Sequence, residues 1–174
     1  MKYLLITGSY RSGTTYLYKA LNNNKKIEIL YQPAIKLFKY LDLVVRKKLK
    51  KKIFKDFPLG ITNINKKIRI KNLFLKKKEI IKIVKNLQKK KDKNFIYFNK
   101  VLNNLNTKNN VITANEFIDI IFKSTIKKKN NKVIIVGIKE PFVGSLLKIL
   151  IQYNKLLIIN IIRDPREILY SRNY

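Results

Sequence analysis

The residues best suited to chemistry lie near the start of the chain, in the stretch GSYRSGTT at positions 8–15. Gly8 and Gly13 permit a tight loop between an apolar run and a helix. Loops of this kind present backbone N–H groups and a helix N-terminus to an anion, and Thr14 and Thr15 add hydroxyl donors. The stretch is a candidate phosphate loop, and the alternative is a chance glycine turn between a strand and a helix.

The cation of this loop is displaced from the place it holds in nucleotide-hydrolysing enzymes. Those enzymes carry a lysine directly after the second glycine, where it reaches the β- and γ-phosphates. Thr14 stands there in this chain, and the nearest cation is Arg11, two residues before Gly13. The pattern argues against ordinary ATP or GTP hydrolysis and predicts that Arg11 meets an anionic ligand from another side.

Two further apolar runs also end in polar residues. Lys139 and Glu140 follow the run at 132–139, and Arg163 and Asp164 follow the run at 155–163. We expect these runs, with 2–8 and 27–35, to be strands, joined by helices at 13–23, 142–153 and 164–172. We expect Ser12 or Thr14 to cap the helix at 13–23, whose apolar face is predicted to be Leu17, Ala20 and Leu21. Strand–helix alternation predicts a parallel α/β sheet with helices on both faces. Ligands of such sheets bind at the carboxyl ends of the strands, where these polar groups gather.

The middle of the chain carries no motif of this kind. Residues 36–130 are rich in Lys and Asn, with helical periodicity at 78–90 and at 113–126, where Thr113 is a candidate cap. Asn-rich stretches at 103–110 and 129–131 are predicted loops. We therefore expect one domain over 1–174, made of a loop unit at 1–35, a helical insertion at 36–130 and a second unit at 131–174.

Composition limits the possible functions. The chain has 174 residues, 46% of them hydrophobic, which is enough for one domain with a core. It has no Cys and no His, so disulfides and thiolate metal sites are excluded, the commonest general base is missing, and no metal is expected. No apolar run is long enough to span a membrane, and the N-terminus does not resemble a signal peptide, so a cytoplasmic location is expected. The net charge of +30 would attract polyanions, so nonspecific polyanion binding is one expectation. The alternative is a coding bias, since Lys, Asn and Ile are over-used together and most of the lysines stand in solvated runs.

The stretch SYRSGTTYL resembles the 5′-phosphosulfate loop of sulfotransferases that use 3′-phosphoadenylyl sulfate (PAPS), in the Arg-Ser-Gly form of carbohydrate and tyrosylprotein members. The resemblance implies a P-loop-like three-layer fold. It implies that Arg11 stabilises charge on the bridging oxygen as the sulfonate leaves. It also implies that the loop binds the 5′-phosphate of PAPS, through Ser12, Gly13, Thr14 and Thr15.

A second stretch, IIRDPREILYSR, is similar to the 3′-phosphate motif of the same family. The resemblance implies that Arg163 and Ser171 bind the 3′-phosphate, and that Lys139, which stands 24 residues before Arg163, contacts the transferred sulfonate. For each residue alone, the ordinary alternative is a surface side chain. The implied activity is transfer of a sulfonate from PAPS to a hydroxyl or amine of an acceptor, for which a glycan is one option, with 3′,5′-adenosine bisphosphate (PAP) as product and no metal.

The chain departs from the family where a base is needed for the acceptor proton. Gln32 stands where relatives carry an acid, and Pro141 where others carry a histidine. Of Glu28, Glu140 and Asp164, we expect Glu140 to be the base. The alternative for Glu140 is an ion pair with Lys139 or Arg11. Relatives also continue beyond the 3′-phosphate motif, so we expect C-terminal family elements to be missing.

Two other functions remain open from the sequence. One is a P-loop nucleotide kinase or NTPase, which would bind ATP with Mg²⁺. The other is a non-catalytic basic protein that binds nucleotides or nucleic acid, whose affinity would fall steeply with salt.

Overall fold

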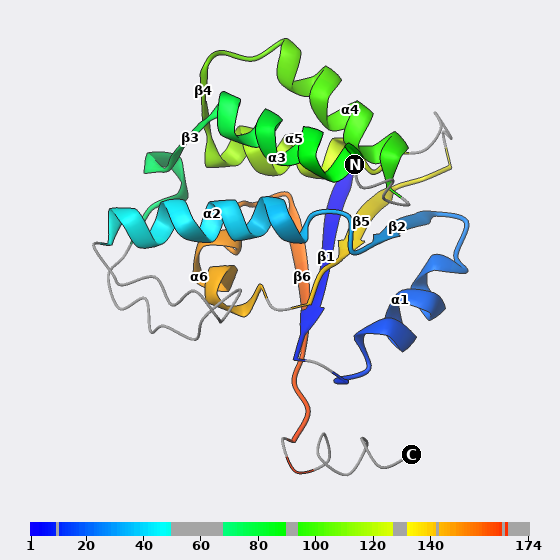
Figure 1. Ribbon diagram of the computed structural model, residues 1–174. Helices are drawn as coiled ribbons and strands as arrows, with labels where there is room; N and C mark the ends of the chain where they lie inside the picture. The colour runs from blue at the N-terminus through cyan, green and yellow to red at the C-terminus, as the bar shows by residue number, and fades with distance from the viewer. Residues whose placement is uncertain are drawn as a thin grey trace.

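The protein folds around a four-stranded parallel sheet (Figure 1). The computed structural model describes residues 1–9, 11–49, 68–89, 94–126, 132–141, 143–164 and 166. The strands lie in the order β2–β5–β1–β6, so the first strand pairs on both sides with strands from the end of the chain. The bounds are Lys2–Gly8 for β1, Ile27–Tyr31 for β2, Ile135–Lys139 for β5 and Leu156–Ile161 for β6.

Strand β1 is apolar from Tyr3 to Ile6 because both of its faces are covered there. Leu4 and Ile6 face helix α1, Thr14–Asn22, and pack there with Ile29 of β2. Tyr3 and Leu5 point to the opposite face and belong to the main core. The side chains of α1 that cover the first face are Leu17, Tyr18 and Leu21.

The opposite face of the sheet is covered by helices of the middle segment and by the short helix Leu147–Leu150, which completes a three-layer α/β fold (Figure 1). Apolar residues at helical spacing turn one side of each long helix inward, as Ile80 and Val84 do in α3. Among the described residues this layer holds α2 (Ile35–Lys48), α3 (Lys77–Lys89), α4 (Phe95–Asn106), α5 (Ala114–Lys123) and the short α6 (Leu147–Leu150), with 3₁₀ turns at Ile70–Asn72 and Gly144–Leu146. None of the helices in the described ranges is long and apolar enough to cross a membrane.

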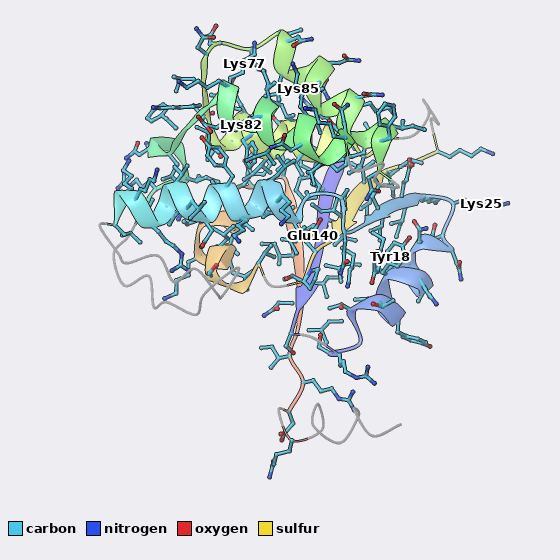
Figure 2. The ribbon with its side chains drawn as sticks, viewed as in Figure 1. Tyr18, Lys25, Lys77, Lys82, Lys85 and Glu140 are labelled. Carbon is cyan, nitrogen blue, oxygen red and sulfur yellow. The ribbon has the colours of Figure 1, made fainter. Side chains whose placement is uncertain are left out.

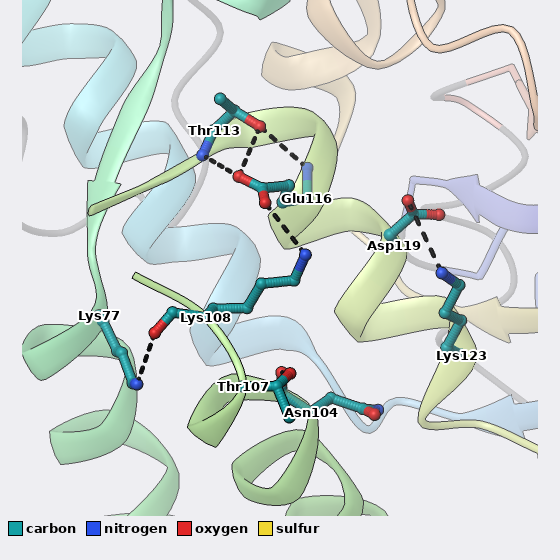
Figure 3. Close-up of polar contacts among 8 residues, drawn as sticks. All are labelled: Lys77, Asn104, Thr107, Lys108, Thr113, Glu116, Asp119 and Lys123. Atoms are coloured by element: carbon teal, nitrogen blue, oxygen red, sulfur yellow. Dashed lines mark hydrogen bonds and ion pairs between the residues drawn. The ribbon is translucent and has the colours of Figure 1, made fainter. Parts of the chain in front are cut away.

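A small antiparallel pair that the sequence analysis did not predict lies in the middle segment. Strand β3, Phe74–Lys76, pairs with β4, Val111–Thr113. Three residues are too few to show a period of two, which explains why the pattern was not recognised. The pair leads directly into α5, whose predicted cap is confirmed: Thr113 Oγ1 accepts a hydrogen bond from the backbone N–H of Glu116, and the Glu116 carboxylate accepts one from Thr113 N (Figure 3).

Several local predictions were wrong. The cap of α1 is Gly13, without a side-chain hydrogen bond, rather than Ser12 or Thr14. Ala20 is exposed, because the covered face of α1 passes through Tyr18 instead. The helix expected at 142–153 is reduced to a 3₁₀ turn and α6, since the backbone turns again at 151–155. The residues at 103–106 belong to α4, and of the stretch at 129–131 nothing is described.

The strand β6 is less enclosed than its apolar sequence predicted. It lies at the edge of the sheet, where it pairs with β1 alone among the described strands. Leu157 and Ile159 stand on the face that α1 covers farther along the sheet, opposite Leu4 and Ile6 in the register, and they are exposed. An apolar run therefore indicated a strand correctly but did not reveal that only one of its faces is covered.

Candidate functional site

The loop after β1 depends on the conformations of its two glycines. Gly13 has φ +90°, in the region that L-residues rarely adopt, and forms the N-cap of α1. Gly8 is needed for a different reason. A Cβ at Gly8 would lie 2.4 Å from the backbone oxygen of Ile161 and 2.7 Å from Ser12 Oγ. The first glycine therefore lets β6 approach the loop, and the second turns the backbone into the helix.

The other loop residues line the start of α1. Thr14 and Ser12 are buried, and Thr15 and Arg11 are exposed. Ser12 Oγ donates a 2.8 Å hydrogen bond to the backbone oxygen of Ser9, which closes the loop on itself. Because no side chain caps α1, its first N–H groups remain available to an anion, whose charge the helix dipole would also favour.

The contact that joins the two ends of the chain is made by Arg163. Its Nη1 donates a 3.2 Å hydrogen bond to the backbone oxygen of Arg11, across 152 positions of sequence. The parallel pairing of β1 with β6 explains the contact, because it sets Gly8 opposite Ile161 and so brings both strand ends to one edge. The predicted partner Ser171 lies outside the described residues.

Lys139 is held beside the same edge by an aromatic ring. Its side chain is buried, and its Nζ lies 4.7 Å from the ring centroid of Tyr31. The Tyr31 ring in turn meets the edge of Tyr18 on α1, with centroids 5.4 Å apart. Because Lys139 pairs in register with both Tyr31 and Ile6, it stands on the α1 face of the sheet. Sequence reasoning did not single out Tyr31, although the alternation Ile27–Ile29–Tyr31 placed it on that face.

Glu140 directly follows Lys139 but serves the opposite face. Its side chain is fully buried, and its Oε1 accepts a hydrogen bond from the backbone N–H of Ala34, the N-cap of α2 (Figure 2). Burial raises the pKa of Glu140 to about 8, while the backbone N–H groups of Ala34 and Ile35 and the charge of Lys139 act in the opposite direction. The Glu140 carboxyl group therefore caps the start of α2, although the two are 106 positions apart in the sequence.

Several buried side-chain oxygens of the described residues have no hydrogen-bond partner. Within the described part of the chain, Glu140 Oε2, Tyr97 OH and Thr7 Oγ1 have no hydrogen-bond partner. Burial, followed by the charge of Glu140, raises the pKa of Tyr97 well above its usual value. No periodic pattern in the sequence connects Tyr97 with Glu140, so sequence reasoning could not have found this pair.

The remaining candidates for the base lie elsewhere. Glu28 stands opposite Val136, near the amino end of β2. It therefore does not lie at the carboxyl edge of the sheet. Asp164 accepts a 2.8 Å hydrogen bond from the backbone N–H of Arg166 and a 2.7 Å one from its guanidinium. Most of the helix expected at 164–172 lies outside the described residues. Gln32, in the place of the family's acid, has φ +49° and donates its backbone N–H to the Lys139 oxygen at 2.9 Å.

The site contains cations and backbone donors rather than metal ligands. No cluster of three or more metal-binding side chains occurs among the residues with described positions. The loop, Lys139 and Arg163 form a concentration of positive charge around the uncapped start of α1. Such an arrangement is suited to a phosphorylated or sulfated anion.

Comparison with known proteins adds no name to this arrangement. No family model matches the chain, and no curated protein matches it. The functional argument therefore depends on the residues of the site.

Proposed function

We propose that the protein is a PAPS-dependent sulfotransferase, whose donor binds at the carboxyl edge of β1, β5 and β6. The observation that supports this most directly is the hydrogen bond from Arg163 to the Arg11 oxygen. It brings together the two segments that resemble the 5′-phosphosulfate loop and the 3′-phosphate motif of that family. The pairing of β1 with β6 brings Arg163 to this edge, where its guanidinium could meet the same anion as the loop.

The chemistry of the donor set fits PAPS. The open N–H groups at Gly13 and Thr14 suit the 5′-phosphate, as backbone donors at a helix N-terminus do. The Arg163 guanidinium, at the neighbouring strand end, suits the second phosphate that distinguishes PAPS from other adenine nucleotides. Lys139 is already desolvated on the α1 face, where its charge would act strongly on a sulfonate.

The proposed reaction is a sulfonyl transfer. An acceptor oxygen or nitrogen forms a bond to sulfur, and the bond between sulfur and the bridging phosphate oxygen breaks. PAP leaves with that electron pair, and the proton of the acceptor passes to a base. Arg11 and Lys139 stabilise the negative charge that develops on the bridging oxygen and the sulfonate. A glycan is one class of acceptor that this scheme admits.

Glu140 stays the predicted base, but its environment sets conditions on that role. At neutral pH its raised pKa keeps most of the group protonated, and its Oε1 is engaged by α2. If Glu140 takes the proton, the transfer rate should increase as pH rises through about 8, and Glu140→Gln should abolish this dependence. A rate in Glu140→Gln equal to wild type at every pH would leave Glu140 only its role at the start of α2.

Calorimetry with three ligands tests the proposal against its alternatives. PAP, ATP with Mg²⁺ and a short DNA duplex are titrated into the protein at moderate salt. We expect PAP to bind most tightly. Preference for ATP with Mg²⁺ would indicate a kinase or NTPase instead, and preference for DNA with a steep loss in salt would indicate a basic binding protein.

A second variant separates donor binding from transfer. Because PAP lacks the sulfonate, Lys139→Met should bind PAP about as well as wild type. With PAPS and a panel of hydroxyl and amine acceptors, the same variant should release PAP on the order of 10²- to 10³-fold more slowly. Equal rates in the two proteins, both with full PAP affinity, would contradict the role of Lys139.

A further inference from the structure

A second concave site lies between α2 and α3, in the layer opposite α1. Its volume is about 300 Å³, at the lower end of the range of small-molecule pockets. It is lined by Lys36, Lys39, Tyr40 and Leu43 of α2 and by Ile83, Asn86 and Leu87 of α3. Nothing in the proposed transfer uses these residues.

The walls of the groove are two stripes at helical spacing. On α2 the residues Tyr40 and Leu43 lie beside the inward stripe that contains Leu41, and on α3 Ile83 and Leu87 lie beside Val84. All four wall residues are half-buried, so apolar surface remains open between the helices. An apolar ligand would remove this surface from water, which favours binding in proportion to the area covered.

Tyr40 gives the groove a fixed aromatic wall. Its hydroxyl accepts a 3.2 Å hydrogen bond from the backbone N–H of Lys76, at the end of β3. The ring is thereby anchored to the small sheet as well as to α2. A wall held in this way does not need to be ordered when a ligand binds, which lowers the entropic cost of binding.

The charge around the groove is positive. Lys36 and Lys39 belong to the lining, which contains no acidic residue. Exposed lysines Lys82 and Lys85 flank Ile83 on α3 (Figure 2). Two acids belong to the same helices: the charge of Glu79 acts on Tyr40, and Asp42 is buried in an ion pair with Arg46.

We propose that this groove binds a single-chain anionic amphiphile. Its apolar chain would lie against Tyr40, Leu43, Ile83 and Leu87, and its carboxylate or phosphate head would meet Lys36 and Lys39. The small volume favours one alkyl chain over a partner protein, whose interface would cover about 800 Å² on each side. This proposal is independent of the proposed sulfotransferase activity.

Calorimetry with dodecanoate below its micelle concentration tests the proposal. We expect dodecanoate to bind at one site per chain. Butanoate lacks the long chain, dodecanol lacks the charge, and dodecyltrimethylammonium has a positive charge instead of a negative one. Each of the three should bind at least about tenfold more weakly. Lys39→Glu should lower the affinity for dodecanoate about tenfold. Lys19→Glu, with the same charge change on α1, is the control and should change the affinity less than about twofold.

Filling the groove separates shape from charge. Leu43→Trp keeps every lysine but occupies the cavity from α2, and Leu87→Trp occupies it from α3. If a thermal melt shows that one variant is unfolded, the other variant replaces it. Either folded variant should lose dodecanoate binding and keep the far-UV circular dichroism spectrum of the wild type. The proposal is overturned if both folded variants retain the wild-type affinity for dodecanoate, or if Lys19→Glu weakens that affinity as much as Lys39→Glu does. It is also overturned if the protein binds vesicles of anionic phospholipid but does not bind dodecanoate.

Discussion

The carboxyl group of Glu140 is enclosed where the sheet meets the first turn of α2, and its Oε1 accepts the N–H of Ala34. Lys139 and Glu140 are neighbours along the chain, but their side chains have separate tasks. Lys139 turns toward α1 and the loop, and Glu140 turns toward α2 and Tyr97. Adjacent residues at the end of a strand thus serve both faces of the sheet, as the alternation of side chains in extended backbone requires.

The raised pKa of Glu140 predicts how stability depends on pH. Between its ordinary value of 4.5 and about 8, the unfolded chain has released this proton and the folded protein has kept it. The free energy of unfolding should therefore fall as pH rises through this window, by at most about 1.4 kcal/mol per pH unit, and level off above it. Urea unfolding at several pH values measures this contribution as the difference between wild type and Glu140→Gln.

Glu116 provides a matched control with the opposite sign. Hydrogen bonding from the N–H of Thr113, and then from Lys108, lowers the pKa of Glu116, so its contribution is full above 4.5 and is lost as pH falls further. Glu116→Gln should therefore alter the acidic limb of the profile and Glu140→Gln the neutral limb. Parallel profiles for wild type and Glu140→Gln would show that the folded state does not hold this proton.

Helix α2 is fixed at its other end by a buried ion pair. Asp42 Oδ2 accepts a hydrogen bond of 2.6 Å from Arg46 Nε, and Asp42 Oδ1 accepts one of 3.0 Å from Ser145 Oγ. Removing the acid leaves a buried guanidinium without its counter-charge. Asp42→Ala should lower the free energy of unfolding by about 3–5 kcal/mol, whereas Ser145→Ala, which removes one hydrogen bond, should cost about 1 kcal/mol. Equal losses in urea unfolding would show that the ion pair adds nothing beyond a hydrogen bond.

The start of α5 offers a smaller test at a half-buried position. Thr113 and Glu116 form a reciprocal cap, and Lys108 Nζ lies 3.1 Å from a Glu116 oxygen (Figure 3). Thr113→Ala should lower the free energy of unfolding by about 0.5–2 kcal/mol, because an N–H at the start of the helix loses its acceptor. Thr107→Ala is the control, since the Thr107 hydroxyl bonds only the Asn104 oxygen, at 3.2 Å, among the recorded contacts, and lies at the exposed end of α4. A loss for Thr113→Ala no larger than for Thr107→Ala would contradict the cap.

The elements themselves were predictable where their signal was long and periodic. The four parallel strands and the helices α3 and α5 follow from apolar runs and from helical spacing, as in Phe117, Ile118 and Ile121. Short elements such as β3 and β4 were not, because three residues do not define a period. The number of covered faces of β6 was not predictable either, since it depends on where other segments pack.

At the scale of the whole molecule, some features of the candidate site were also predictable from the sequence and others were not. Strand order brings Gly8, Lys139 and Arg163 to one edge, and the sequence already predicted this from the position of polar residues after apolar runs. The side on which each group acts came only from pairing register, which set Tyr31 beside Lys139 and Glu140 beneath α2. Register is a property of packed strands and is not written in any one segment.

The net charge of +30 complicates every binding measurement on this protein. Any polyanion will be attracted, so affinity alone does not identify a nucleotide site. The informative comparison is between two ligands that differ in one phosphate, measured at the same ionic strength.

PAP and adenosine 5′-monophosphate are such a pair, because they differ only in the 3′-phosphate. We expect calorimetry on wild type to show tighter binding of PAP, and Arg163→Ala to weaken PAP on the order of 10- to 100-fold with little change for the monophosphate. Arg69→Ala, which removes an equal charge beside the 3₁₀ turn at Ile70–Asn72, should leave both affinities near wild type. Equal affinity of the two nucleotides for wild type, or equal weakening of both by Arg163→Ala, would contradict a site in which Arg163 and the loop together hold PAPS.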